Sequence, residues 1–280
     1  MKINLMPRRF VSKIVKGYKR SRRFIKIDVV KEFSLFAPSS SGTYRMLASQ
    51  TIREIQLAFP SLARLVTSIV GDISIIPIQQ FCNDGNLENA KNFKKLSDLN
   101  GSDKCNDHNY HFLYGEILAP REKKMHILEI GIGSNNLDVA SNMGLDGTPG
   151  ASLRTFRDFC TNSEVIGADI DERILFSETR ISTTRVDQTD EDSLMQFQKN
   201  FPLKFDLVVD DGLHSPLANI STLDLGMKII KIGGWIVIED IPRDAISVWQ
   251  VIKALMPQNY MTYILQDGDD FAFALQKISA

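Results

Sequence analysis

The sequence predicts an α/β protein built on a doubly wound, mostly parallel sheet of seven strands. Two observations carry this prediction. Short apolar runs recur from residue 126 onward, and amphipathic stretches long enough for helices lie between most of them. Strands separated by helices imply right-handed βαβ crossovers, and therefore strands that run in parallel. A length of 280 residues with 43% hydrophobic residues suits one such domain with an appendage.

Each apolar run is an expected strand, and each amphipathic stretch between runs is an expected helix. A short turn at residues 267–270 leaves no room for a helix between the last two runs, so they should form a hairpin. One strand at the edge of the sheet should therefore run antiparallel. The strands are expected at residues 126–132, 164–170, 181–187, 205–210, 234–240, 260–265 and 271–276. The helices are expected at residues 152–160, 190–201, 217–230 and 244–255.

The start of the chain differs in pattern from the rest. Residues 1–96 are expected to form a mainly helical region, and residues 97–280 the domain that contains the sheet. Helical spacing covers residues 50–70, with an interruption at Pro60 because proline removes a helix hydrogen bond. No stretch of 18 apolar residues is present, so no transmembrane helix is expected. Three scattered cysteines fit a reducing compartment, such as the cytoplasm, better than a disulfide framework.

Charge is unevenly distributed along the chain. Residues 1–26 carry ten of the 33 basic side chains and no acidic one, which leaves 23 basic against 34 acidic groups in the remainder. Apolar residues lie among these charges, so residues 1–26 could form a basic helix that rests on an anionic membrane surface. A solvated terminal helix or a disordered start is the alternative. One short basic patch does not indicate a nucleic-acid partner.

The first expected strand ends in a glycine turn, at the position where open α/β sheets bind ligands. Glu129 precedes Gly131 and Gly133, but Asn136 occupies the third glycine position of a dinucleotide fingerprint. The next acidic strand end, Asp169, follows Gly131 by 38 residues, against about 20 in dinucleotide sites. Glu129 would also repel a pyrophosphate. The pattern therefore disfavours a nicotinamide oxidoreductase and favours a cationic nucleoside without phosphate.

The L-E-I-G-I-G motif at residues 128–133 resembles the S-adenosylmethionine site of class I methyltransferases, which have a Rossmann-like fold. G-A-S-L-R at residues 150–154 and G-A-D-I-D at residues 167–171 resemble one subgroup. It comprises the metal-dependent sugar O-methyltransferases of macrolide biosynthesis, of the mycinamicin and demethylmacrocin type. V-D-Q-T-D at residues 186–190 and the D-K and H-N-Y motifs within residues 103–110 resemble the same subgroup. The resemblance covers about residues 97–275 and implies S-adenosylmethionine as cofactor.

The resemblance implies roles for individual residues at the cofactor site. Asp169 would accept hydrogen bonds from the ribose hydroxyls, which suits a carboxylate at a strand end. Asp187 and Gln188 would flank the adenine, while Asp210 would touch the cofactor or cap the following helix. The glycines taken alone would equally fit a tight turn between a strand and a helix. The implied cofactor-binding residues are Glu129, Gly131, Gly133, Ser152, Asp169, Asp187, Gln188 and Asp210.

Two acidic clusters follow at the ends of neighbouring strands, D-D-G-L-H at residues 210–214 and E-D at residues 239–240. Carboxylates that converge repel one another unless a cation lies between them, and an all-oxygen set suits Mg²⁺ or Mn²⁺. A histidine beside them has a suitable pKa for general-base work near pH 7. The resemblance implies that Asp211, Glu239 and Asp240 bind the metal and that His214 takes the proton from a sugar hydroxyl.

The sequence therefore predicts an enzyme, a metal-dependent O-methyltransferase that acts on a hydroxyl of a sugar or glycoside, either a natural product or a surface glycan. A metal-independent methyltransferase and a non-catalytic module that keeps the cofactor-binding fold are the alternatives. His108, Tyr110 and His111 are candidates for the other wall of the acceptor pocket, although simple alternation explains them equally well. A cytoplasmic location is expected, with membrane contact and self-association left open.

Overall fold

The computed structural model describes residues 44–280, so the predictions for residues 1–26 lie outside the described residues. The described chain divides into two compact units between Leu65 and Val66, earlier than the boundary predicted after residue 96. Residues 75–100 belong with the sheet, because they supply one of its strands and a helix packed on it. Helix α2 (Tyr44–Val70) continues through Pro60, where an interruption was predicted.

The second unit contains a mixed sheet of nine strands in the order β1-β8-β9-β7-β6-β2-β3-β5-β4. All seven predicted strands are present, with ends close to those expected. The central strands β7, β6, β2, β3 and β5 are parallel, so their carboxyl ends meet at one edge. The strands are β1 (Ile75–Pro77), β2 (His126–Ile130), β3 (Glu164–Asp169), β4 (Ser177–Glu178), β5 (Ile181–Arg185), β6 (Phe205–Asp210), β7 (Ile230–Ile241), β8 (Tyr260–Asp267) and β9 (Asp270–Lys277).

Two features of the sheet correct the prediction. The sheet has nine strands rather than seven, because β1 adds to β8 in parallel and β4 adds to β5 in antiparallel orientation. Strands of three and two residues are too short to show a periodic pattern. The predicted hairpin of β8 and β9 is present, but its reversed strand β9 lies between β8 and β7 and not at the edge. The expectation of a reversed edge strand at this hairpin is therefore wrong.

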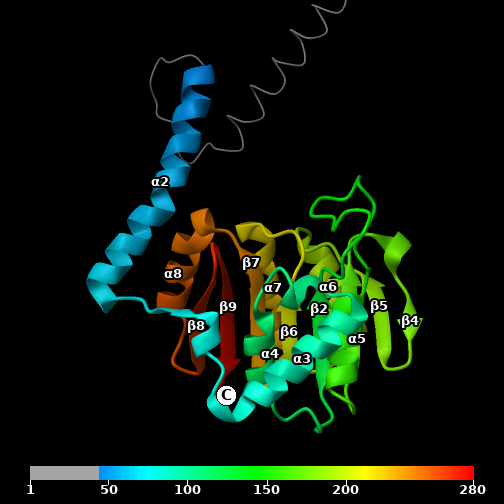
Figure 1. Ribbon diagram of the computed structural model, residues 1–280. Coiled ribbons are helices and arrows are strands. Elements are labelled where there is room, and N and C mark those ends of the chain that lie inside the picture. The colour runs from blue at the N-terminus through cyan, green and yellow to red at the C-terminus, as the bar shows by residue number, and fades with distance from the viewer. Residues whose placement is uncertain (1–43) are drawn as a thin grey trace, which may run out of the picture. The chain divides into compact units, whose positions relative to one another are not determined.

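Helices cover both faces of the sheet and enclose two hydrophobic cores (Figure 1). Successive strand residues face opposite cores, as Ile127 and Leu128 do, because side chains alternate along a strand. One face carries α3 (Leu87–Asn100), α4 (Tyr110–Ile117) and α5 (Ala151–Phe159), and the other carries α6 (Glu191–Asn200), α7 (Pro216–Ile229) and α8 (Ile246–Leu255). Among the helices of residues 44–280, none has the length and apolar character needed to cross a membrane.

Candidate active site

The site lies at the carboxyl edge of the sheet, where the turn after β2 meets the loop after β6. Gly131 adopts a positive φ of 89°, and a Cβ atom there would lie 2.1 Å from the backbone oxygen of Asp211. A glycine is therefore required, both for the backbone conformation and for the close approach of the two segments. This contact places the predicted cofactor turn directly beside the predicted acidic cluster.

A cavity of about 370 Å³ opens above β2, β3 and β5. It collects five of the predicted cofactor-binding residues: Gly131, Gly133, Asp169, Asp187 and Gln188. Asp169 is held at the rim because its carboxylate accepts hydrogen bonds from the backbone N–H groups of Ile132 (3.0 Å) and Asp171 (2.9 Å). Apolar side chains complete the wall, so the cavity combines apolar lining with a fixed carboxylate. It is suited to a nucleoside. The apolar side chains are Ile130, Val139, Ile170, Val186 and Leu213.

The charge of this cavity selects among nucleotides. Its lining carries five aspartates and one arginine, Arg173. Arg173 is already paired with Asp171 and Asp138 and holds the pKa of the Asp171 carboxyl well below its usual range. The remaining negative charge attracts a cationic ligand and repels phosphate groups. The geometry thus agrees with the sequence-based preference for a cationic nucleoside without phosphate.

Asp210 and Gln188 form a buried hydrogen-bonded pair beneath the cavity. The Gln188 amide donates to Asp210 (2.7 Å), which also accepts from the side chain of Asn219 on α7 (3.1 Å). Burial raises the pKa of the Asp210 carboxyl. Gln188 in turn accepts the backbone N–H of Leu213 (2.9 Å). Asp210 was predicted to contact the cofactor or cap the following helix; in the described structure it fixes the loop of residues 211–214.

A second cavity of about 250 Å³ adjoins the first and shares Gly133, Ser141 and Asp211 with it. Its wall brings together Asp211, His214 and Asp240, whose ligand atoms all lie within 4.8 Å of one another. His214 and Asp240 have positive φ angles of 54° and 51°. Each such conformation costs a non-glycine residue about 1–3 kcal/mol and is found mainly at functional sites. Ser215 caps α7 directly after His214, which fixes where the loop ends.

These three residues form a group of donors that fits a small divalent cation. Two carboxylates supply the hard oxygen atoms that Mg²⁺ and Mn²⁺ prefer, and the cavity leaves room for hydroxyl oxygens. Nδ1 of His214 is buried and, within residues 44–280, has no hydrogen-bond partner. Its Nε2 lies 4.0 Å from Oδ2 of Asp240. A buried polar atom without a hydrogen-bond partner is rare in proteins. Its presence at Nδ1 of His214 points to a bound ligand or to proton transfer at this site.

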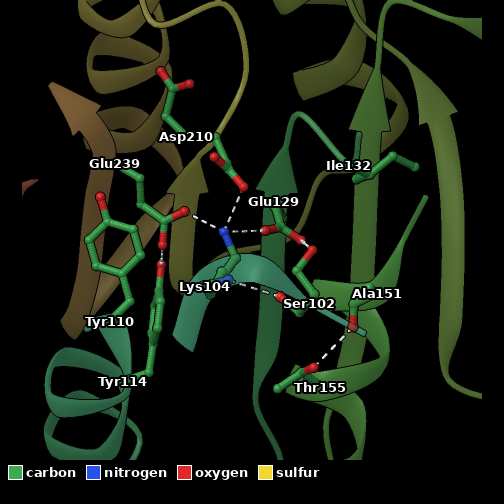
Figure 2. A network of polar contacts seen from close by, with 12 residues as sticks. Ser102, Lys104, Tyr110, Tyr114, Glu129, Ile132, Ala151, Thr155, Asp210 and Glu239 are labelled. Atoms are coloured by element: carbon green, nitrogen blue, oxygen red, sulfur yellow. Dashed lines mark hydrogen bonds and ion pairs between the residues drawn. The ribbon is translucent and has the colours of Figure 1, made fainter. Parts of the chain in front are cut away.

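Lys104 lies at the centre of a buried ionic network beneath this group (Figure 2). Its ammonium is 2.7 Å from Oδ2 of Asp211 and 3.1 Å from Glu129, and it also donates to Glu239. Burial alone would lower the pKa of Lys104, but the three carboxylates raise it well above its usual value. Lys104 was noted only as part of the D-K motif and had no predicted role, although its side chain is 2% exposed and contacts acids at the ends of three strands.

Glu129, Ser152 and Glu239 belong to this network. Glu129 is fully buried and accepts a hydrogen bond from Ser152 (2.6 Å), which itself faces the second cavity. Burial raises the pKa of Glu129 to about 7, against the opposing effect of Lys104. Glu239 is 1% exposed and accepts hydrogen bonds from Lys104 and Tyr114. Both carboxylate oxygens of Glu239 are thus engaged, and Glu239 is not part of the group whose ligand atoms cluster, Asp211, His214 and Asp240.

The three candidates for the other wall have different surroundings. Tyr110 hydrogen-bonds to Asp240, and His108 stacks on Tyr110 with Nε2 3.4 Å from Oδ1 of Asp240. Both residues therefore adjoin the site. His111 instead packs against Phe112, and burial lowers its pKa.

Comparison with known proteins confirms the resemblance that the motifs indicated. The chain is 29% identical over 165 residues to the 8-demethyl-8-α-L-rhamnosyl tetracenomycin-C 2′-O-methyltransferase of Streptomyces olivaceus, which covers 59% of this chain and 40% of the relative. It is 30% identical over 120 residues to the mycinamicin VI 2″-O-methyltransferase of Micromonospora griseorubida, covering 43% and 28% of the two chains. The chain thus spans less than half the length of these curated relatives. No protein-family model matches it.

Solved structures support the fold. The MycE methyltransferase of the mycinamycin biosynthetic pathway, in complex with Mg, SAH and mycinamycin VI, superposes with a TM-score of 0.54 at 20% identity. The match covers 67% of this chain and 53% of that one. A second crystal form with Mg and SAH gives the same TM-score at 18% identity and covers 87% and 62% of the chains. The predicted class I methyltransferase fold is therefore confirmed.

Proposed function

We propose that the protein is an S-adenosylmethionine-dependent O-methyltransferase that acts on a hydroxyl group of a sugar or glycoside. The observation that carries this proposal is the junction of two cavities at Gly133, Ser141 and Asp211. One cavity suits a cationic nucleoside, and the other presents carboxylates and a histidine. A methyl donor in the first cavity would thus lie next to an acceptor in the second. The curated relatives, each named as an O-methyltransferase, support the same reaction.

The residues have distinct roles in the proposed reaction. Asp211 and Asp240 would hold a divalent cation beside the acceptor, and Asp169 would hold the ribose hydroxyls of the donor. A bound Mg²⁺ or Mn²⁺ would lower the pKa of the acceptor hydroxyl. His214 would take the hydroxyl proton as the oxygen–carbon bond forms and the sulfur–carbon bond breaks, which leaves S-adenosylhomocysteine. Holding both reactants in adjoining cavities supplies the orientation that this displacement requires.

Glu239 is proposed to support the cation site through Lys104, which also contacts Asp211, and not to bind the cation directly. Its carboxylate oxygens are engaged by Lys104 and Tyr114 in the described structure. Lys104 also donates to Oδ2 of Asp211, which leaves the second oxygen of that carboxylate for the cation. This differs from the ligand set implied by the family motif, which adds Glu239 to Asp211 and Asp240.

Location and partners are further parts of the proposal. Cys82, Cys105 and Cys160 are free and buried, in keeping with a reducing compartment such as the cytoplasm. The acceptor is proposed to be a glycoside of a natural product or a surface glycan, because the relatives act on glycosylated natural products by name. Membrane contact through residues 1–26 remains a separate proposal that rests on the charge of that segment.

Calorimetric titration with S-adenosylhomocysteine tests the cofactor assignment. Asp169→Asn is expected to weaken binding by about 1.5–3 kcal/mol, because the substitution removes a charged hydrogen-bond acceptor. Asp146→Asn provides the matched control, since Asp146 is exposed in the loop between β2 and α5 and lines neither of the two described cavities. The control should bind like the wild type. Equal affinity in wild type and Asp169→Asn would show that the nucleoside binds elsewhere.

A further inference from the structure

Two tyrosines on α4 contact two adjacent acids at the end of β7. Tyr110 and Tyr114 are four residues apart, so their side chains lie on the same face of the helix. The Tyr110 hydroxyl reaches Asp240, and the Tyr114 hydroxyl reaches Glu239. Both side chains are buried, with Tyr110 and Tyr114 1% and 0% exposed. One helix therefore contacts the two acids separately.

The contact between Tyr110 and Asp240 involves both the side chain and the backbone. The Tyr110 hydroxyl donates to Oδ1 of Asp240 (2.6 Å) and accepts the backbone N–H of the same residue (3.0 Å). Asp240 has the positive φ of 51°, a conformation that persists only when its surroundings hold it. With Oδ1 engaged, Oδ2 is the oxygen on the side of His214, 4.0 Å from Nε2. His108 stacks on the Tyr110 ring with centroids 5.0 Å apart and supports it.

We infer that Tyr110 is a positioning residue for the cation site, which holds Asp240 so that Oδ2 faces Asp211 and His214. The inference rests on the proposed function, because the cation site belongs to it. Tyr114 provides the contrast. It contacts Glu239, whose carboxylate is also held by Lys104 on the inner side of the network. The two tyrosines are therefore matched in helix and burial, and their hydroxyls differ in which acid they hold and in the backbone N–H of Asp240, which Tyr110 accepts.

Manganese binding to the full-length protein tests this assignment, measured by electron paramagnetic resonance and by calorimetry. Tyr110→Phe is expected to weaken Mn²⁺ binding by roughly 10–100-fold, the effect of removing a partner that orients a metal ligand. Tyr114→Phe removes an equivalent hydroxyl from the same helix and should bind Mn²⁺ like the wild type. Equal weakening in both variants, or no weakening in Tyr110→Phe, would overturn the inference.

A second readout does not depend on the metal. The amide of Asp240 should exchange with solvent faster in Tyr110→Phe than in Tyr114→Phe, because only the first variant removes its acceptor. An unchanged exchange rate would overturn the inference.

Asp240→Asn in the Mn²⁺ titration separates the inference from the proposed function. If Asp240→Asn binds Mn²⁺ like the wild type, the proposed cation site is wrong. If it loses Mn²⁺ while Tyr110→Phe does not, the positioning role alone is wrong.

Discussion

Replacing His214 with alanine is expected to lower kcat for methyl transfer by roughly 10²–10⁴, the usual contribution of a general base. The acceptor would be a glycoside with free vicinal hydroxyls that the wild type methylates, with S-adenosylhomocysteine release as the measurement. The deficit should shrink as pH rises, because hydroxide can then take the proton in place of His214. Affinity for S-adenosylhomocysteine should be unchanged, because Asp169, Asp187 and Gln188 line the other cavity.

The same variant distinguishes a base from a metal ligand, since His214 lies within the group formed with Asp211 and Asp240. As a base, His214 can be lost without a change in Mn²⁺ affinity. A large fall in Mn²⁺ affinity in His214→Ala would contradict the proposed role and make the imidazole a ligand. His126→Ala is a suitable control, because His126 begins β2 at the amino-terminal ends of the parallel strands, opposite the site. This variant should keep the wild-type kcat.

Replacing Lys104 with methionine is expected to lower the free energy of unfolding by about 3–5 kcal/mol, the cost of leaving buried charges without their partner. Methionine keeps an unbranched side chain that is one atom shorter, and it removes the cation shared by Glu129, Asp211 and Glu239. Two of these acids are at most 1% exposed, so water cannot replace the lost contact. Urea denaturation at neutral pH measures the change.

Lys228→Met is the control for loss of a lysine as such. Lys228 pairs with Asp224 one turn away on α7, and its side chain is 54% exposed. An exposed pair of this kind contributes at most about 1 kcal/mol. If Lys104→Met and Lys228→Met unfold at similar urea concentrations, the network around Lys104 does not stabilise the fold in the way described.

Much of the sheet was predictable because β2, β3, β6 and β7 each contain an apolar run with an acid or a glycine at or near its end. The run of residues 205–210 coincides with β6, and the run of residues 164–170 extends one residue past β3. Strand β7 begins at Ile230, four residues before its predicted start at residue 234, and continues through Gly233, which has a positive φ of 84°. The edge strands β1 and β4 were missed, since pairing with a neighbour defines them and their own sequences do not.

The site was predictable at strand ends and less so where partners come from distant segments. Glu239 and Asp240 are adjacent in sequence and were grouped as metal ligands, but Asp240 has a positive φ of 51° and lies where the pairing of β7 with β9 shifts register, between Ile238 and Ile241. Adjacency in sequence therefore does not give the two carboxylates the same surroundings. Glu239 accordingly meets Lys104, whereas Asp240 meets Tyr110 and the second cavity. Lys104 itself lies 135 residues from Glu239 along the chain, so no local pattern could have paired them.

The central claim is that a methyl donor and a divalent cation occupy adjoining cavities that meet at Asp211. A crystal structure of the protein with S-adenosylhomocysteine and Mn²⁺ tests it most directly, with anomalous scattering to locate the ion. The account predicts the nucleoside against Asp169, Asp187 and Gln188, and the ion on Asp211 and Asp240 beside His214. A nucleoside outside that cavity, or Mn²⁺ absent from Asp211 and Asp240 at saturating concentration, would contradict it.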